Sequence, residues 1–280
     1  MLQTLGSIFN TLFANPILNV LVLISDLLES VGIIGSFGFA IILVTVIIRV
    51  VLHPFFQKQI KTAQVMKDLK PKLDALQKKY KKDPQKLQKE QLALYQKEGI
   101  NPASGCLFAV VQIPLIYGLF QVLQFILEND KDGTLVSRIN ERLYHPGLFI
   151  QSIDPNFFVY NLGLSPQLGA TWYYYAIPVI TSGLQFLQSK VTLSQNPMTD
   201  VSAISQTEEE KKNGKKKKSS TSEEFQKAMN TQMKYFFPVM IGYFSFSLPI
   251  GISLYWNTFS IFSIVQHYIS KNKADKLKKV

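Results

Sequence analysis

One charged residue, Arg49, lies inside the otherwise uncharged run of residues 30–52. A charge in a membrane-spanning helix costs about 2.5–3.5 kcal/mol on insertion scales, and it usually faces a protein interior or a hydrated cavity. No Asp or Glu lies in the predicted spans, so the counter-charge would come from water, lipid or a bound anion. The long side chain can also reach the membrane interface near His53. Two interpretations of Arg49 therefore stay open, an anion-binding site and an interfacial anchor.

Uncharged polar side chains are the other candidates for a site within the apolar runs. They are Gln112, Gln121, Gln124, Gln185, Gln188, Asn257 and Gln266. Such side chains either face a hydrated cavity or form hydrogen bonds between helices, which average about 0.6 kcal/mol in measured cases. The sequence leaves both roles open.

Signatures of catalysis and metal binding are missing from the sequence. It contains no HExxH, no GxSxG, no glycine-rich phosphate loop and no pair of aspartates within spans. His53, His145 and His267 are scattered over loop ends, and Cys106 is the single cysteine. We therefore expect neither a metal site nor an intramolecular disulfide, and a protein that is not an enzyme and uses no cofactor.

The elements that position these side chains are predicted to be membrane-spanning helices. The chain has 280 residues, 47% of them hydrophobic, and a net charge of +11. Residues 101–127, 171–189 and 235–270 carry no charged residue, whereas the surface helices of soluble proteins carry charges on one face. The last run would form a helix of about 54 Å, so it must cross a core of about 30 Å twice. We expect five spans, at residues 31–54, 101–127, 171–190, 231–250 and 251–270, the last two short and reversing at Pro249 and Gly251.

Basic residues concentrate in the loops of one predicted side. Residues 55–100 hold 12 Lys, residues 190–234 hold 9 and residues 271–280 hold 5. Residues 128–170 hold three basic residues against five acidic ones. Short loops rich in Lys and Arg stay cytoplasmic, so we expect the N-terminus outside, the C-terminus inside and an extracytoplasmic loop at 128–170.

Residues 1–30 precede the first span. The apolar stretch from Pro16 to Leu28 has 13 residues, which suits a segment lying in the outer interface better than a span. We therefore expect an interfacial segment, with a sixth span as the alternative. The first 29 residues contain no Lys or Arg and so lack the start of a secretory signal, and we expect the mature chain to begin near Met1.

The charged residues 55–100 are predicted to form a cytoplasmic helical hairpin, because apolar residues recur there every three or four positions. Asp83 and Pro84 suit the start of its second helix, and Gly99 suits its end. Pro71 should kink or break the first helix. A hairpin with so little core is expected to be mobile and to act as a docking site, or else as a solvated spacer.

The other cytoplasmic segments are polar. Residues 191–230 are expected to be largely disordered, because 200–224 contain hardly any apolar residue. The tail, residues 271–280, is basic. These charges can attract anionic lipid or ribosomal RNA, although retention of the loops on the cytoplasmic side explains them equally well.

Four motifs occur in the order known from one family. They are IIRVVLHPF at 47–55, DPQKLQKEQLALYQKEGINPASGC at 83–106, QIPLIYGLF at 112–120 and LPIGISLYWNTFSIFSIVQ at 248–266. From about Asn15 to Lys271 the chain resembles the YidC/Oxa/Alb membrane protein insertases, in the short form without a large periplasmic domain. The resemblance implies an all-α fold of five spans around a groove that is open to the cytoplasm and to lipid and closed toward the outside.

The resemblance also implies a site and a function. Arg49, Gln112, Gln188 and Trp256 are expected to line the groove. The protein would insert and help fold newly made membrane proteins in a bacterial cytoplasmic membrane, without ATP, with Arg49 attracting acidic residues of the client. The expected partners are nascent membrane proteins, the ribosome, membrane lipids, the Sec translocon and the signal recognition particle receptor, with no specific binding of DNA.

Some observations depart from this resemblance or allow another function. Phe108 stands where family members often have proline, and the insertion 200–224 has no clear counterpart. The alternative function is a channel or small-solute transporter with an anion site at Arg49. Many transporters contain paired repeats, and the five spans have no visible internal similarity, which counts against this alternative.

Overall fold

The protein is mostly helical, as the sequence predicts. The computed structural model describes residues 2–80, 83–99, 104–127, 133–168, 171–193 and 232–277. The elements in chain order are α1 (Leu2–Phe9), η1 (Asn10–Ala14), α2 (Asn15–Ser30), α3 (Ser36–Val51), α4 (His53–Lys79), α5 (Pro84–Lys97), α6 (Ser104–Ile126), α7 (Leu135–Asn140), η2 (Pro146–Leu148), β1 (Asn156–Phe157), β2 (Tyr160–Asn161), η3 (Trp172–Tyr175), α8 (Ala176–Leu193), η4 (Gln232–Phe236), α11 (Phe237–Ser247) and α12 (Ile250–Leu277). The expected disorder of residues 191–230 falls almost entirely outside the described residues.

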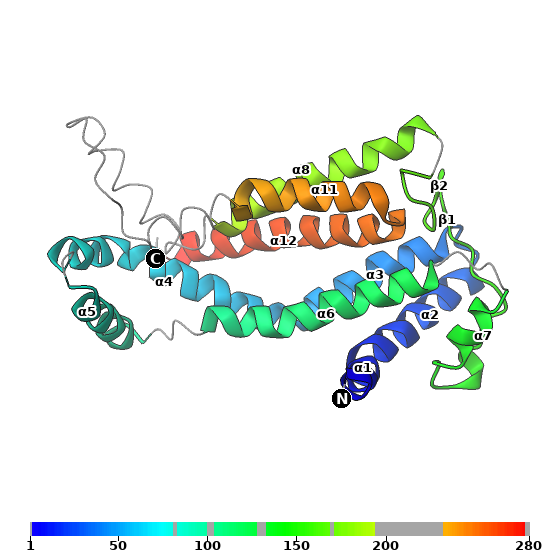
Figure 1. Cartoon of the computed structure of the whole chain (residues 1–280), viewed down its shortest axis with the longest axis horizontal. Coiled ribbons are helices and arrows are strands. Elements are labelled where there is room, and N and C mark those ends of the chain that lie inside the picture. The colour runs from blue at the N-terminus through cyan, green and yellow to red at the C-terminus, as the bar shows by residue number, and fades with distance from the viewer. Residues whose placement is uncertain are drawn as a thin grey trace.

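The helices α3, α6, α8, α11 and α12 run side by side along the molecule (Figure 1). The hairpin of α4 and α5 lies at one end, and α7 and the two strands lie at the other. The central helix is α12, which packs against both α8 and α3 and also contacts α6, α11 and α4. A side chain on α12 can therefore face several other helices.

The N-terminal segment is longer than its apolar stretch suggested. The chain is helical without a break from Leu2 to Ser30, and α2 packs against α3 and α6. Within the described part of the chain, the 25-residue stretch Gly6–Ser30 is the one helix long and apolar enough to cross a membrane on length and composition alone. α3 and the stretch Ile113–Ile126 of α6 are apolar but shorter. The 13-residue apolar stretch is therefore part of a longer helix, and both expectations for this segment, an interfacial position and a sixth span, stay open.

The uncharged run 235–270 is divided between two helices that meet where the reversal was expected. α11 ends at Ser247, α12 begins at Ile250, and the turn between them contains Pro249. Backbone nitrogens of Ile250 and Gly251 donate to the oxygens of Leu164 and Leu162 at 3.0 and 2.9 Å. A Cβ at Gly251 would meet Leu127 and Leu162, so the turn packs closely under the loop.

The two helices of this run differ in length, and their ends do not mark the edges of a membrane, so the two short spans stay a prediction. α11 has 11 residues and follows η4 without a break, whereas α12 has 28 and continues into the basic tail as far as Leu277. At 1.5 Å per residue these lengths are about 16 and 42 Å. The long helix is possible because the Lys-rich sequence after residue 270 still has good helix formers.

The charged residues 55–100 form the predicted hairpin. Asp83 accepts a hydrogen bond from the backbone nitrogen of Lys86 at 3.0 Å, so it caps α5 as predicted. Gly99 follows the helix with a positive φ of 67°. The helix does not break at Pro71, because α4 continues through this residue, and the alternative of a kink stays a prediction. Leu69 and Leu73 on either side of Pro71 are buried against Tyr95 of α5, and this packing supports the helix where a backbone hydrogen bond is lost.

The main core joins α2, α3, α6 and α12 to the loops at the α7 end of the molecule. Its most deeply buried side chains are Leu18, Leu21, Ile41, Leu119, Leu123, Ile139, Leu162 and Ile252. Ile139 belongs to α7 and Leu162 to the segment after β2. The helices are thus fixed to one another at this end by the folded loops.

Candidate functional site

Arg49 lies in the last turn of α3, and its side chain is only 2% exposed. Its Nη2 donates a hydrogen bond to the backbone oxygen of Phe259 at 3.3 Å and another to Oγ of Ser263. Both acceptors belong to α12. The guanidinium therefore joins α3 to α12 instead of extending along its own helix toward the membrane interface.

Two aromatic rings enclose the guanidinium. Its Cζ lies 3.5 Å from the ring centroid of Phe259 and 4.6 Å from that of Phe56, which is in the first turn of α4. A cation over an aromatic face gains about 2 kcal/mol or more where both are desolvated. Arg49 thus lies where α3, α4 and α12 meet. We call Arg49, Phe56, Phe259 and Ser263 the Arg49 site.

The charge of Arg49 is not neutralised by a carboxylate within the described part of the chain. No ion pair to an Asp or Glu is formed there, and its Nε is buried without a hydrogen-bond partner. Burying a charge costs several kcal/mol, and each hydrogen bond to a charged group returns about 1.5–3 kcal/mol. The site therefore keeps a free N–H donor and an uncompensated positive charge, the two features that attract an anion.

The junction of α3 and α4 is attached to α12 at a second point. Nδ1 of His53 lies 2.7 Å from Nε2 of Gln266, whose side chain is buried. The other ring nitrogen of His53 lies 2.7 Å from Nε2 of Gln57. His53, which the sequence placed at a loop end, therefore takes part in a contact between helices.

Three residues of the Arg49 site, Phe56, Phe259 and Ser263, were missed from the sequence. Phe259 and Ser263 recur with Gln266 at intervals of four and three, which places these three on one face of a helix. This spacing was visible in the sequence. The sequence did not show that this face packs against α3, since periodicity does not tell which helix a face contacts.

Gln188 reaches a neighbouring face of α12. Ser260 Oγ donates to Oε1 of Gln188 at 2.7 Å and accepts from Nε2 of Gln185 at 3.1 Å. Ser260 is fully buried, and Gln185 is 8% exposed. At 100° per residue, Ser260 lies about 100° around the helix from Phe259. Gln188 and Arg49 thus approach α12 from different helices and on different sides.

A second hydroxyl cluster continues this contact toward the turn between α11 and α12. Ser245 Oγ lies 2.7 Å from Oγ of Ser253 and donates to Oγ1 of Thr181 at 3.4 Å, and all three are buried. The polar residues between α8, α11 and α12 therefore satisfy one another. This arrangement matches the interhelical role that the sequence left open for Gln185 and Gln188.

The structure shows fewer contacts for the other predicted residues. Trp256 is half-buried and packs against the main core. Gln112 and Phe108 lie in α6, but their side chains are outside the described residues. Asn257 has a buried Oδ1 without a hydrogen-bond partner. Among the predicted residues whose side chains the structure describes, Arg49, Gln185 and Gln188 are thus brought onto α12 by hydrogen bonds.

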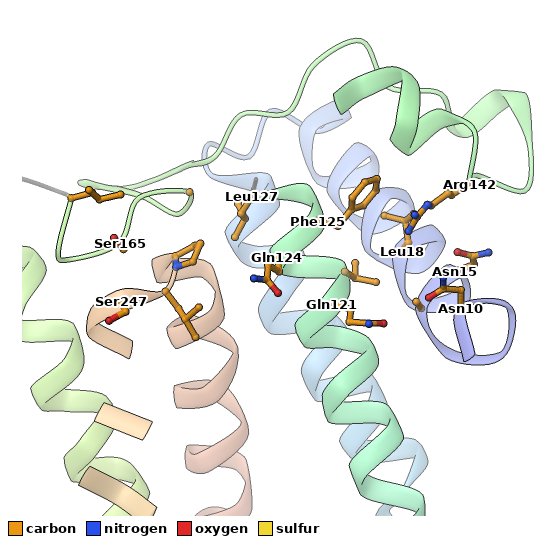
Figure 2. A pocket seen from close by; sticks show the side chains of 16 residues that line it. Asn10, Asn15, Leu18, Gln121, Gln124, Phe125, Leu127, Arg142, Ser165 and Ser247 are labelled. Atoms are coloured by element: carbon orange, nitrogen blue, oxygen red, sulfur yellow. The ribbon is translucent and has the colours of Figure 1, made fainter. Parts of the chain in front are cut away.

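A hollow of about 650 Å³ lies at the α7 end of the bundle, and we call it the Gln121 hollow. Figure 2 shows Gln121 and Gln124 of α6 beside it, with Arg142 and Asn15 on the facing side. No residue that the resemblance placed in the groove lines this hollow. In the sequence analysis Arg142 was only one of the basic residues of the loop 128–170. The sequence did not show that this loop folds back onto α2.

Comparison with known proteins identifies the family of this chain. The family model described as "60Kd inner membrane protein" matches residues 29–278. The chain belongs to the YidC/Oxa/Alb family. The predicted resemblance is therefore confirmed, and a place in a membrane agrees with the family description.

Relatives within the YidC/Oxa/Alb family match almost the whole chain. The "Membrane protein insertase YidC" of Alkalihalophilus pseudofirmus is 31% identical, over 97% of this chain and 85% of the relative. The protein of the same name from Oceanobacillus iheyensis is 30% identical, over 92% and 82%. "Inner membrane protein ALBINO3, chloroplastic" of Arabidopsis thaliana is 30% identical, over 90% of this chain and 50% of its own length.

The Ser260 contact makes a prediction for stability. Ser260→Ala removes the hydroxyl shared by Gln185 and Gln188, which leaves a buried amide without its partner, so it should lower the free energy of unfolding by about 1–3 kcal/mol. Thr258→Val is the matched control, because this hydroxyl bonds only to the backbone of α12. Thermal unfolding of both variants in detergent is the measurement. Equal losses would show that the Ser260 contact does not hold the helices together.

Proposed function

We propose that this protein is an insertase, which inserts newly made membrane proteins into the bilayer and helps them fold. The observation that carries the proposal is the buried Arg49, whose charge has no carboxylate partner among the described residues. The relatives that match most of the chain are named membrane protein insertases. No observation favours the alternative of a channel or small-solute transporter.

The proposed topology has five spans, formed by α3, α6, α8, α11 and α12. The N-terminus lies outside and the C-terminus in the cytoplasm of a bacterial cell. Lys-rich segments at one end of the bundle support this orientation, because the hairpin of α4 and α5 and the C-terminal end of α12 lie there together (Figure 1). The loop with α7 and the strands, at the other end, would face outward.

Arg49 would act by attracting an acidic residue in the client segment that must cross the membrane. Two unit charges attract each other far more strongly in a protein interior than in water, since the effective dielectric constant is lower there. The unpaired Nε–H would donate to the carboxylate while Nη2 keeps its hydrogen bonds to α12. The client segment would thereby be drawn partway across, without ATP.

Other polar and apolar side chains would complete the path of the client. We place Gln112, Gln188 and Trp256 along a groove beside α12, with polar groups toward the client's hydrophilic part. The hydrophobic part would then pass into lipid along apolar side chains that are exposed on α11, such as Val239 and Tyr243. The two short final spans predicted from the sequence would favour a thinner bilayer at this point.

The charge of Arg49 can be tested apart from its packing. Arg49→Met keeps a long side chain between Phe56 and Phe259 but removes the charge, so it should slow insertion of a client with an acidic outer segment about tenfold. Arg49→Lys should retain most of the rate, because a positive charge remains. The measurement is insertion of purified clients into proteoliposomes that contain the full chain.

The deciding control changes the client. When the client's acidic residues are replaced by their amides, wild type and Arg49→Met should insert it at rates within about twofold of each other. A defect of equal size for acidic and neutral clients would contradict electrostatic attraction and leave Arg49 as a structural residue. Thermal unfolding of Arg49→Met, compared with wild type, separates this result from a loss of folded protein.

The cytoplasmic elements are proposed to bind partners of synthesis and targeting. The hairpin of α4 and α5 has a small core of Leu69, Leu73 and Tyr95, so most of its surface is available for a client, the Sec translocon or the signal recognition particle receptor. The basic tail would contact ribosomal RNA by attraction to phosphate, and the same charges would attract anionic lipids. Nothing in the proposal requires specific binding of DNA.

Replacing the five lysines of residues 271–280 by glutamine should reduce co-sedimentation with ribosomes, most strongly at low salt. Replacing the same lysines by arginine is the control that keeps the charge. The dependence of binding on salt should become shallower in the glutamine variant only. An unchanged salt dependence would mean that the tail merely enforces the topology.

A further inference from the structure

The Gln121 hollow lies away from the Arg49 site. The proposed function gives no role to the side chains that line it. It is bounded by the start of α2, the last turns of α6, the loop near Ser165 and the turn between α11 and α12. Figure 2 shows amide and hydroxyl side chains together with an arginine around one space. Its volume, about 650 Å³, is that of a small-molecule site.

Arg142 is held in place at the edge of this hollow. Nδ2 of Asn19 donates to the backbone oxygen of Arg142 at 3.1 Å, and Oδ1 of Asn19 accepts from the backbone nitrogen of Tyr144 at 2.7 Å. Asn19 is 6% exposed, so this clamp is buried. The Cζ of Arg142 lies 4.3 Å from the ring centroid of Phe125. Within the described residues, its guanidinium makes no ion pair with a carboxylate.

Gln121 offers an acceptor inside the same hollow. Its Nε2 donates to the hydroxyl of Tyr117 at 3.0 Å, whereas its Oε1 is buried without a hydrogen-bond partner. A buried carbonyl oxygen without a donor costs about 1–3 kcal/mol. The hollow therefore combines an exposed guanidinium, whose backbone is held by Asn19 and which suits a phosphate, with an acceptor that suits a hydroxyl group.

An exposed apolar surface leads away from Gln121 along α6. Tyr117 and Ile113 lie one and two turns before Gln121 on the same face of the helix, and they are 51% and 63% exposed. Leu12 of the adjacent η1 is 63% exposed. In the proposed orientation this surface lies deeper in the membrane than the hollow. A polar pocket followed by an apolar track matches a molecule with a charged head and a hydrocarbon tail.

We propose that the Gln121 hollow binds the headgroup of an anionic glycerophospholipid of the outer leaflet. The phosphate would lie against Arg142, a headgroup hydroxyl would donate to Oε1 of Gln121, and an acyl chain would follow Tyr117 and Ile113. A bound lipid would thus hold η1 and α2 against α6. The inference uses the membrane orientation proposed above, but it does not depend on insertase activity.

Binding of dioctanoyl-phosphatidylglycerol to the purified full chain in detergent tests this inference, with native mass spectrometry as the readout. The wild type should bind it at least tenfold more tightly than dioctanoyl-phosphatidylcholine, which lacks the net charge and the headgroup hydroxyl. Arg142→Gln should weaken binding about tenfold, the factor expected for one charge-assisted hydrogen bond. Gln121→Met should weaken it less, since that contact is uncharged.

Arg138→Gln is the matched control. Arg138 also lies over Phe125, at 5.0 Å, but it does not line the hollow, so this variant should bind within about twofold of wild type. Equal weakening by the two arginine variants would overturn the site, because it would indicate a general effect of charge. Equal binding of the two lipids would also overturn it. Displacement by millimolar inorganic phosphate would identify a site for free anions instead of lipid.

Discussion

The guanidinium of Arg49 between Phe56 and Phe259 sets the arrangement of the helices around it. It is a full charge in an interior where its desolvation costs several kcal/mol. Hydrogen bonds to α12 and two aromatic faces offset much of that cost. Because these partners belong to α4 and α12, the charge can stay buried only if α3, α4 and α12 meet at this point.

The same interaction explains why the site can also take part in function. A buried arginine that was fully paired with a carboxylate would gain little from a passing acidic residue. Here the described residues leave Nε without an acceptor and the charge without a counter-charge. The polar residues of the neighbouring face, Gln185, Gln188 and Ser260, instead satisfy one another. The attraction for an anion is thereby concentrated at one side chain.

The sequence predicted the features that depend on local chemistry. The helical fold, the cap at Asp83 and the reversal near Pro249 follow from composition, capping and the length of an uncharged run, and the structure has all three. A break at Pro71, one of the two expectations there, does not occur, because local rules do not include the burial of Leu69 and Leu73 against the second helix. The sequence also did not show that α12 continues into the basic tail, since charge patterning marks a membrane boundary but not a helix boundary.

Contacts between distant segments were beyond local rules. Arg49 was singled out by its charge, but its partners Phe259 and Ser263 lie more than 200 residues away in the chain. Gln121 and Arg142 were visible only as separate polar and charged residues, although Figure 2 shows that they surround one hollow. Periodicity shows which residues share a helix face, and only the packed structure shows what that face contacts.

Disulfide formation between the insertase and a client held partway through insertion tests the central claim most directly. Ser263→Cys places a thiol beside Arg49, with Cys106→Ala removing the native thiol, and the client carries one cysteine next to its acidic residue. With an added oxidant, copper phenanthroline, the acidic client should form the mixed disulfide at a high yield. The same client with its acidic residue replaced by the amide should form much less. Equal yields from the two clients, or none from either, would contradict a direct attraction between Arg49 and the client's carboxylate.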